Sequence, residues 1–168
     1  FPRRNPDALG NAWFVDAYEL VENADSEIVA LNDFNPAKEA IIDVRWKDQF
    51  ETFEFKYDTT RSIELVEYHP NKLIYEYHAE KDQMVVFSEI FYDKGWNAFI
   101  DGEIKPHFRC NYVLRGMIVP AGKHSVEFKF EPKSYFIGSK ISLVSSILLI
   151  IIMVGVFFVE IKKYISKA

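Results

Sequence analysis

Histidine, cysteine and carboxylate side chains are the residues of this sequence that could bind a metal ion or catalyse a reaction. The chain holds one cysteine, Cys110, and four histidines: His69, His78, His107 and His124. Metal centres take their ligands from closely spaced pairs of such residues, and no His, Cys or Asp pair here has that spacing. We therefore expect neither a bound metal nor any other cofactor.

Nucleophilic catalysis also finds little support in the residue pattern. Cys110 follows His107 by three positions, and in an extended segment two such side chains point to opposite faces. Ser88 and Ser125 fall inside strand patterns and lack a nucleophile elbow. The neighbouring carboxylates suit turns and solvated strand positions better than acid and base catalysis: Glu89, Asp93, Asp101 and Glu103. We predict no catalytic residue in this chain.

Binding of a carbohydrate or of a protein partner is a more specific hypothesis than metal binding or catalysis. Sugar rings stack on aromatic faces, and amide and guanidinium groups donate hydrogen bonds to hydroxyls. The candidate surface consists of Tyr92, Trp96, Arg109, Asn111 and Arg115. Trp96 also suits the core of a β fold, and we expect it to serve the fold. The two arginines are alternatively suited to lipid phosphates, which guanidinium groups bind well.

Length and composition indicate one globular domain with an apolar core. The chain has 168 residues, of which 49% are hydrophobic and 16% aromatic. Its formal net charge is -5, whereas a nucleic-acid-binding protein needs a surplus of Lys and Arg gathered on one face. We therefore expect no nucleic-acid partner.

The elements that must position the candidate surface are short strands. Apolar and polar residues alternate from position 62 onward, and a nearly continuous apolar segment at 84–92 predicts a central strand. Asp101-Gly102 predicts a tight hairpin, and Pro120-Ala121-Gly122 predicts the turn into a last strand whose Val126 and Phe128 face inward. We predict an antiparallel β-sandwich over residues 62–137, of jelly-roll or immunoglobulin-like type with seven or eight strands.

A small α/β lobe is predicted ahead of the sandwich, with a connector that completes residues 1–61. It begins with one strand at 12–21 and continues with a short helix capped by Asn23 or Asp25. Ile28 and Leu31 lie three positions apart in that helix, so we expect them to share one of its faces. The segment AIIDV then predicts a second strand. The chain is therefore expected to be mainly β.

An uncharged apolar run near the end of the chain predicts a transmembrane helix. The 19 residues from Ile141 to Val159 carry no charge, and about 20 such residues cross the hydrocarbon layer as a helix. We place the helix at 138–160 and a cytoplasmic tail at 161–168. Lysines flank the run on both sides, so the positive-inside rule does not decide the orientation.

The beginning of the sequence bears on that orientation. It opens at Phe1 with no Met and no apolar signal segment that would carry a globular part across a membrane. Two expectations remain open: a cytoplasmic domain held by a tail anchor, or a domain delivered outside by an upstream membrane portion.

Several segments together resemble one protein family. The run GWNAFIDG at 95–102 and HFRCNYVLRGMIVPAGKHSVEFKFEP at 107–132, followed by an apolar helix, resemble the carboxy-terminal end of the YfhO family of bacterial membrane proteins. NPDALGNAWFVDAYELV at 5–21 and SEIFYDKGW at 88–96 are similar to its members from Bacteroidetes. The resemblance covers essentially the whole chain.

The resemblance implies a late portion of a polytopic protein similar to GT-C glycosyltransferases, which use lipid-linked sugars at the outer face of the cytoplasmic membrane. The acidic catalytic residues of such enzymes lie in early loops, so no catalytic role transfers to residues of this chain. Upstream helices would place the domain outside the cytoplasm and leave Lys162 and Lys163 inside. The implied function is accessory to sugar transfer, with membrane lipid, upstream helices and a glycan as partners. The alternative is a non-enzymatic module that binds a protein in an envelope complex.

Overall fold

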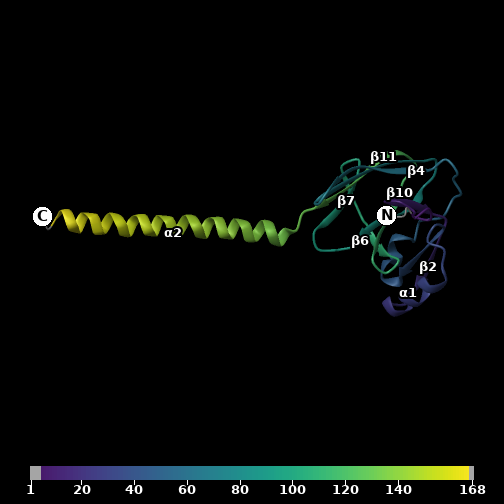
Figure 1. Ribbon diagram of the computed structural model, residues 1–168, viewed down its shortest axis with the longest axis horizontal. Helices are drawn as coiled ribbons and strands as arrows, with labels where there is room; N and C mark the ends of the chain where they lie inside the picture. Colours follow the sequence, from purple (N-terminus) through teal and green to yellow (C-terminus); the bar gives the residue numbers. More distant parts are fainter. Residues whose placement is uncertain (1–4, 167–168) are drawn as a thin grey trace. The chain divides into compact units, whose positions relative to one another are not determined.

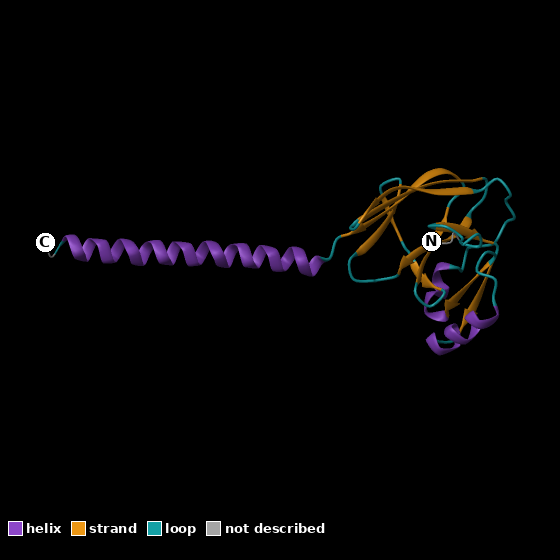
Figure 2. Cartoon of the chain, in the orientation of Figure 1, coloured by secondary structure: helices purple, strands orange, loops and turns teal. Residues whose placement is uncertain are grey.

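The computed structural model describes residues 5–166, which form two compact units, 5–131 and 132–166 (Figures 1 and 2). The first unit is built mainly from strands, and the second is a single helix. In chain order the elements are β1 (Ala12–Val15), β2 (Ala17–Val21), α1 (Ala24–Ala30), η1 (Leu31–Asp33), β3 (Glu39–Asp43), η2 (Val44–Gln49), β4 (Ser62–His69), β5 (Lys72–Ala79), β6 (Gln83–Ile90), β7 (Trp96–Ile100), β8 (Glu103–Lys105), β9 (Phe108–Cys110), β10 (Leu114–Val119), β11 (Gly122–Phe130) and α2 (Lys133–Ile165).

Two antiparallel sheets make the body of the first unit. A four-stranded sheet has the order β1-β6-β10-β9, and a five-stranded sheet has the order β4-β5-β11-β7-β8. We call them the central sheet and the outer sheet. A core of buried side chains from both sheets lies between them, including Val85 and Met117 from the first and Tyr75 and Phe128 from the second. The predicted antiparallel sandwich is therefore confirmed.

The other face of the central sheet is buried as well. A second core joins Val15, Met84, Val86 and Phe108 of this sheet to side chains of β3 and of the loop after η2. Strands β2 and β3 pair in parallel, and α1 connects them, which gives the predicted small α/β portion. Figure 1 shows the resulting three layers, with α1 and β2 on the side of the central sheet away from β4 and β11.

Burial on both faces explains the unbroken apolar pattern of β6. Its residues Met84, Val85, Val86 and Phe87 are all fully buried, with neighbours alternately in the second and first cores. Gln83 precedes them and is also buried, and its side-chain amide donates to the carbonyl oxygen of Lys56 at 2.8 Å. The expectation of a central strand is confirmed, since β6 lies between β1 and β10.

The predicted strand at 12–21 is wrong in one respect, because it is two strands in different sheets. Strand β1 pairs with β6 in the central sheet, whereas β2 pairs with β3. The chain changes direction at Asp16, whose carboxylate binds the guanidinium of Arg61 at 2.5 Å and whose backbone amide donates to the carbonyl of Lys38. Apolar residues continue on both sides of Asp16, so the sequence pattern does not reveal the break.

A glycine in the central sheet permits close packing against an aromatic ring. An added Cβ at Gly116 of β10 would overlap the Cε2 atom of Phe108, which is fully buried on the neighbouring strand β9. Carbon atoms do not approach so closely without displacement of one of them. The ring of Phe108 therefore occupies the space that any larger residue at position 116 would need.

The second unit is the helix α2, which extends beyond the apolar run of the sequence at both ends. It begins at Lys133 and ends at Ile165, and it is long and apolar enough to cross a membrane. Two of its serine hydroxyls are satisfied within the helix: Ser145 and Ser146 donate to carbonyl oxygens four residues earlier, at 2.9 Å each. Such internal bonds remove the need for a polar partner in the hydrocarbon layer.

We predict that Phe128→Ala destabilises the globular unit by about 3 to 5 kcal/mol, because the ring is fully buried in the first core and its removal leaves a cavity. Glu127→Ala is the matched control on the opposite face of β11, where the carboxylate forms surface ion pairs with Lys129 and Lys72. Its expected cost is under about 1 kcal/mol. Urea denaturation in detergent measures both, and equal losses would contradict the assigned faces.

Candidate functional site

The structure divides the five predicted surface residues into two groups. Tyr92, Trp96 and Arg115 gather at one end of the sandwich together with Phe130 of β11. The ring of Phe130 lies 5.3 Å from that of Trp96 and 6.5 Å from that of Tyr92. Tyr92 is half exposed, whereas Trp96 packs partly buried against the first core.

Arg115 in this group is almost completely buried, at 2% exposure. Its guanidinium lies over the ring of Trp96 at 4.1 Å, and its Nε donates to the carbonyl oxygen of Ile90 at 3.0 Å. No carboxylate in the described chain forms an ion pair with it, and burial lowers its pKa. Stacking on Trp96 and Phe128 therefore holds this cation inside the fold, away from lipid or ligand at the surface.

The second group, Arg109 and Asn111, binds the α/β portion to the central sheet. Arg109 donates from Nη2 to the Oε2 atom of Glu27 at 2.7 Å, and Glu27 is fully buried on α1. The second oxygen of that carboxylate accepts the backbone N–H of Tyr112 at 2.8 Å. Asn111 exchanges two hydrogen bonds of 2.8 Å with the backbone of Ile41 in β3. These side chains are therefore engaged within the protein.

Glu27 was not foreseen from the sequence, and it is the fully buried residue of α1. Ile28 is 44% exposed, whereas Leu31 is partly buried. The reason is the ion pair: a carboxylate that meets Arg109 and a backbone amide directs the helix inward at position 27. The helix does begin as expected, since Asn23 accepts the backbone N–H of Ser26.

Two described residues with reactive side chains, Cys110 and His107, have surroundings that fit a structural role. Cys110 is fully buried, and burial raises the pKa of its thiol. Burial together with the nearby Arg115 lowers the pKa of His107 to about 4, so this imidazole is neutral near pH 7. Within residues 5–166, no three His, Cys, Asp or Glu side chains converge as a metal site.

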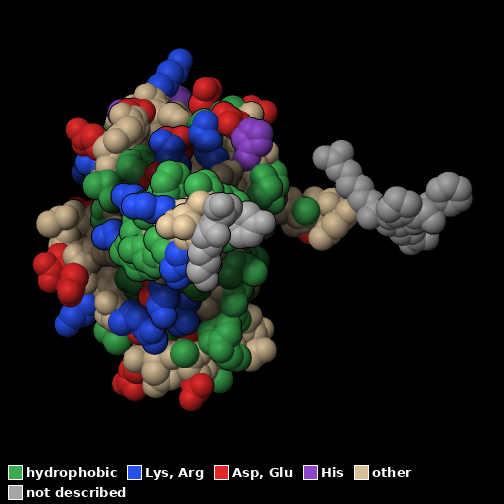
Figure 3. Space-filling view, turned by 90° about the vertical axis from the view of Figure 1, so that its left-hand side faces the viewer, with side chains coloured by type: hydrophobic (Ala, Val, Ile, Leu, Met, Phe, Trp, Pro, Cys, Tyr) green, Lys and Arg blue, Asp and Glu red, His purple; other side chains and the backbone are tan. Residues whose placement is uncertain are grey.

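Charge alone does not mark a site on the face drawn in Figure 3. Acidic and basic side chains are interspersed there, as the net charge of -5 on 168 residues would suggest. A surface of mixed positive and negative charge does not attract a highly charged ligand to one place. Hollows and hydrogen-bonding groups are therefore the features that can mark a binding site on it.

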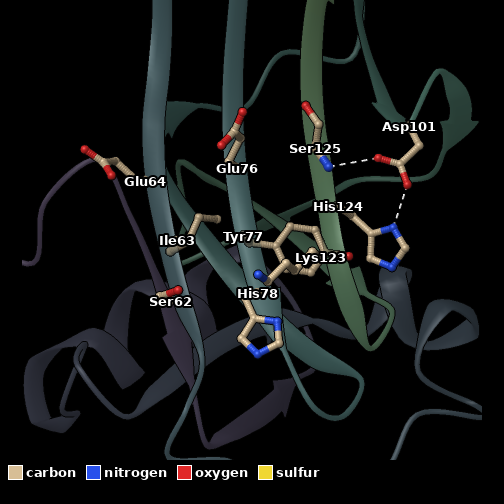
Figure 4. Close-up of a pocket in the computed structure, with 10 residues that line it drawn as sticks. All are labelled: Ser62, Ile63, Glu64, Glu76, Tyr77, His78, Asp101, Lys123, His124 and Ser125. Atoms are coloured by element: carbon tan, nitrogen blue, oxygen red, sulfur yellow. Dashed lines mark hydrogen bonds and ion pairs between the residues drawn. The ribbon is translucent and has the colours of Figure 1, made fainter.

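A hollow of about 650 Å³ lies on the outer sheet, and we call it the outer groove. Figure 4 shows the strands β4, β5 and β11 side by side, with Asp101 reaching toward β11 from the neighbouring turn. Two rows of polar residues cross these strands. The pairing of the strands makes the rows Ser62, His78, Lys123 and Glu64, Glu76, Ser125.

One edge of the outer groove is fixed by a carboxylate and an imidazole. Asp101 accepts the backbone N–H of Ser125 at 2.9 Å and binds Nδ1 of His124 at 2.5 Å. The Nε2 atom of His124 lies 3.0 Å from the carbonyl oxygen of Ala121. Both ring nitrogens thus face acceptors, which favours the doubly protonated imidazolium. Asp101 and Gly102 have φ values of 50° and 85°, and they join β7 to β8 as the predicted hairpin.

The hydrogen bonds to Asp101 and Ala121 raise the pKa of His124. A histidine with a raised pKa contributes stability below its unfolded pKa, near 6.5, and loses that contribution as pH rises through the folded value. We predict that the melting temperature falls on going from pH 6 to pH 9, and that His124→Gln reduces this fall. His69→Gln, at an exposed position on β4, is the control. An unchanged pH profile in His124→Gln would contradict the assignment.

We predict that Glu27→Ala destabilises the globular unit by about 2 to 4 kcal/mol, because Arg109 and the amide of Tyr112 lose a buried partner. Glu22→Ala, at an exposed position just ahead of α1, should change stability by no more than about 0.5 kcal/mol. Thermal or chemical denaturation distinguishes the two variants. Similar losses would show that the carboxylate of Glu27 does not bind the two parts together.

Comparisons with known proteins identify the family. The family described as "Bacterial membrane protein YfhO" matches residues 46–142, which is more than half of the chain. A Bacillus subtilis protein described as "Uncharacterized protein YfhO" is 29% identical over 104 residues, covering 62% of this chain and 11% of the relative. No solved structure matches the chain. With its apolar helix and its match to this family, the chain belongs to the YfhO family of bacterial membrane proteins.

Proposed function

We propose that the sandwich is an extracytoplasmic domain of a polytopic YfhO-like protein and that it assists the transfer of lipid-linked sugars without itself catalysing the reaction. The observation that carries the proposal is the family match, which spans the sandwich strands from β4 onward and enters the apolar helix α2. The domain would lie on the periplasmic side of the bacterial inner membrane, where acceptor polymers are found. Membrane lipid and the upstream helices of the same protein would be its constant neighbours.

The surroundings of the reactive side chains support the non-catalytic part of this proposal. Cys110 lies in a core with a raised pKa, Asp101 and His124 hold two turns, and Glu27 pairs with Arg109. A general acid or base must reach a substrate proton, whereas these groups are engaged with the protein itself. The chemistry would then take place in the membrane portion, and the sandwich would position an acceptor or a loop.

Topology gives the first test of the proposal. A reporter that fluoresces only in the cytoplasm is fused after Ala168 of the full-length protein, and a phosphatase active only outside is inserted in the Asp101-Gly102 hairpin. Both reporters should be active, because a helix of 33 residues carries the chain across once. A silent terminal reporter in a well-expressed fusion would contradict the orientation.

A second function is favoured by the exposed apolar side chains at the Trp96 end of the sandwich. Ile90 is 71% exposed, Tyr92 49% and Phe130 36%, and large exposed apolar groups often mark protein contacts. In that alternative the domain is an interaction module within an envelope complex. A photo-crosslinking residue at position 92 would capture a distinct protein in that case, whereas the sugar-transfer role requires no such partner.

A further inference from the structure

The outer groove differs from the rest of its sheet in that three of its charged side chains have no partner among the described residues. In the described chain, the side chains of Glu64, Glu76 and Lys123 form no hydrogen bond or ion pair. Farther along the same sheet, Glu127 pairs with Lys129 at 2.7 Å, and Glu67 pairs with Lys72 at 3.1 Å. The charges of Glu127 and Glu67 are thus neutralised by neighbouring lysines, whereas those of the groove residues are not.

The two glutamates of the groove also repel each other. Glu64 and Glu76 are direct partners in the pairing of β4 with β5, and side chains at such positions are about 5 Å apart at their Cβ atoms. Like charges at directly opposed positions destabilise a sheet. Figure 4 draws the two carboxylates directed away from each other, so each can accept a hydrogen bond from a separate donor of a ligand.

The second row of the groove adds donors beside those acceptors. His78 stands next to Ser62 on one side and Lys123 on the other, and all three line the groove. Residues two positions apart on a strand point to the same face, so both rows line one surface of about 10 Å by about 7 Å. Donors and acceptors therefore alternate at spacings that suit a ligand with several hydroxyl groups.

We propose that the outer groove binds a carbohydrate, with Glu64 and Glu76 accepting hydrogen bonds from adjacent hydroxyl or amino groups of one sugar and His78 and Lys123 contacting its oxygen atoms. Every sugar hydroxyl both donates and accepts, which matches a surface where the two kinds of group are mixed. The size of the surface suits a monosaccharide or a short oligosaccharide. This inference rests on the proposed role in sugar transfer and supplies it with a site.

Other ligand classes fit the groove less well. A phosphate would meet the two carboxylates, which repel it. A bare divalent cation needs several oxygens converging on one point, and the described residues provide no such group of three His, Cys, Asp or Glu side chains. Two adjacent carboxylates favour an amino sugar over a neutral one, because its ammonium group forms a charge-assisted hydrogen bond.

Saturation-transfer NMR tests the groove directly. The complete chain in detergent micelles is mixed with the methyl glycosides of glucose, galactose, mannose and glucosamine at millimolar concentration. At least one sugar should receive saturation, with glucosamine bound most tightly. Glu76→Gln keeps the shape of the side chain and removes its charge, and it should weaken binding by about tenfold or more.

Glu127→Gln is the matched control, since it makes the same change on the same face of the sheet outside the groove. It should leave sugar binding within about twofold of the original protein, and both variants should remain folded, with melting temperatures within a few degrees of the original. Equal weakening in the two variants, or no saturation of any of the four sugars, overturns the proposal. Binding of Ca²⁺ without any sugar also overturns it and identifies a cation site instead.

Experiments on the full-length protein distinguish an error in the groove assignment from an error in the proposed function. Removal of residues 1–131 should stop the sugar modification of envelope polymers, measured by mass spectrometry, and Glu76→Gln should reduce it. If removal stops the modification and Glu76→Gln leaves it unchanged, the groove assignment is wrong and the accessory role stands. If Glu76→Gln loses sugar binding while removal of the domain has no effect on modification, the accessory role is wrong and the groove stands.

Discussion

The central sheet is buried on both faces, and the rest of the globular unit depends on that constraint. The outer sheet covers one face through the first core, and β3 with the loop after η2 covers the other through the second core. A strand in this position gains burial from every residue, which is why Met84, Val85, Val86 and Phe87 are all fully buried. The outer sheet has only one face in a core, and its other face is left to carry polar groups. The outer groove lies on this second face, which no further layer covers.

Two arginines, one partly buried and one fully buried, are accommodated in different ways within this arrangement. Arg109 meets the carboxylate of Glu27 and thereby fixes α1 to the turn after β9, so the pair sets how the α/β portion lies on the central sheet. Arg115 forms no ion pair with a carboxylate among the described residues and is held by the faces of Trp96 and Phe128 and by one carbonyl oxygen. An aromatic face recovers part of the hydration energy that a cation loses on burial. Both arginines serve the architecture, and the surface available to ligands lies elsewhere.

Local patterns in the sequence predict most of the sandwich, because each strand with one buried face shows period-two alternation and each tight turn shows its preferred residues. The Asp101-Gly102 hairpin, the inward Phe128 and the central position of β6 follow from such patterns. The division at Asp16 and the inward Glu27 do not, since both depend on partners distant in the sequence, Arg61 and Arg109. The outer groove was missed for a related reason: it consists of side chains from three strands, and only their register shows which carboxylates are neighbours.

The contact between Gly116 and Phe108 has a consequence for how this family can vary. The missing side chain and the ring share one volume on neighbouring strands, so neither position can change size independently. Among relatives that keep the two cores, an alanine or serine at the position of Gly116 should occur together with a smaller residue at that of Phe108. Substitutions at the two sites should therefore be correlated across aligned sequences, and a chimaera that combined the larger residue at both would lose the register between β9 and β10.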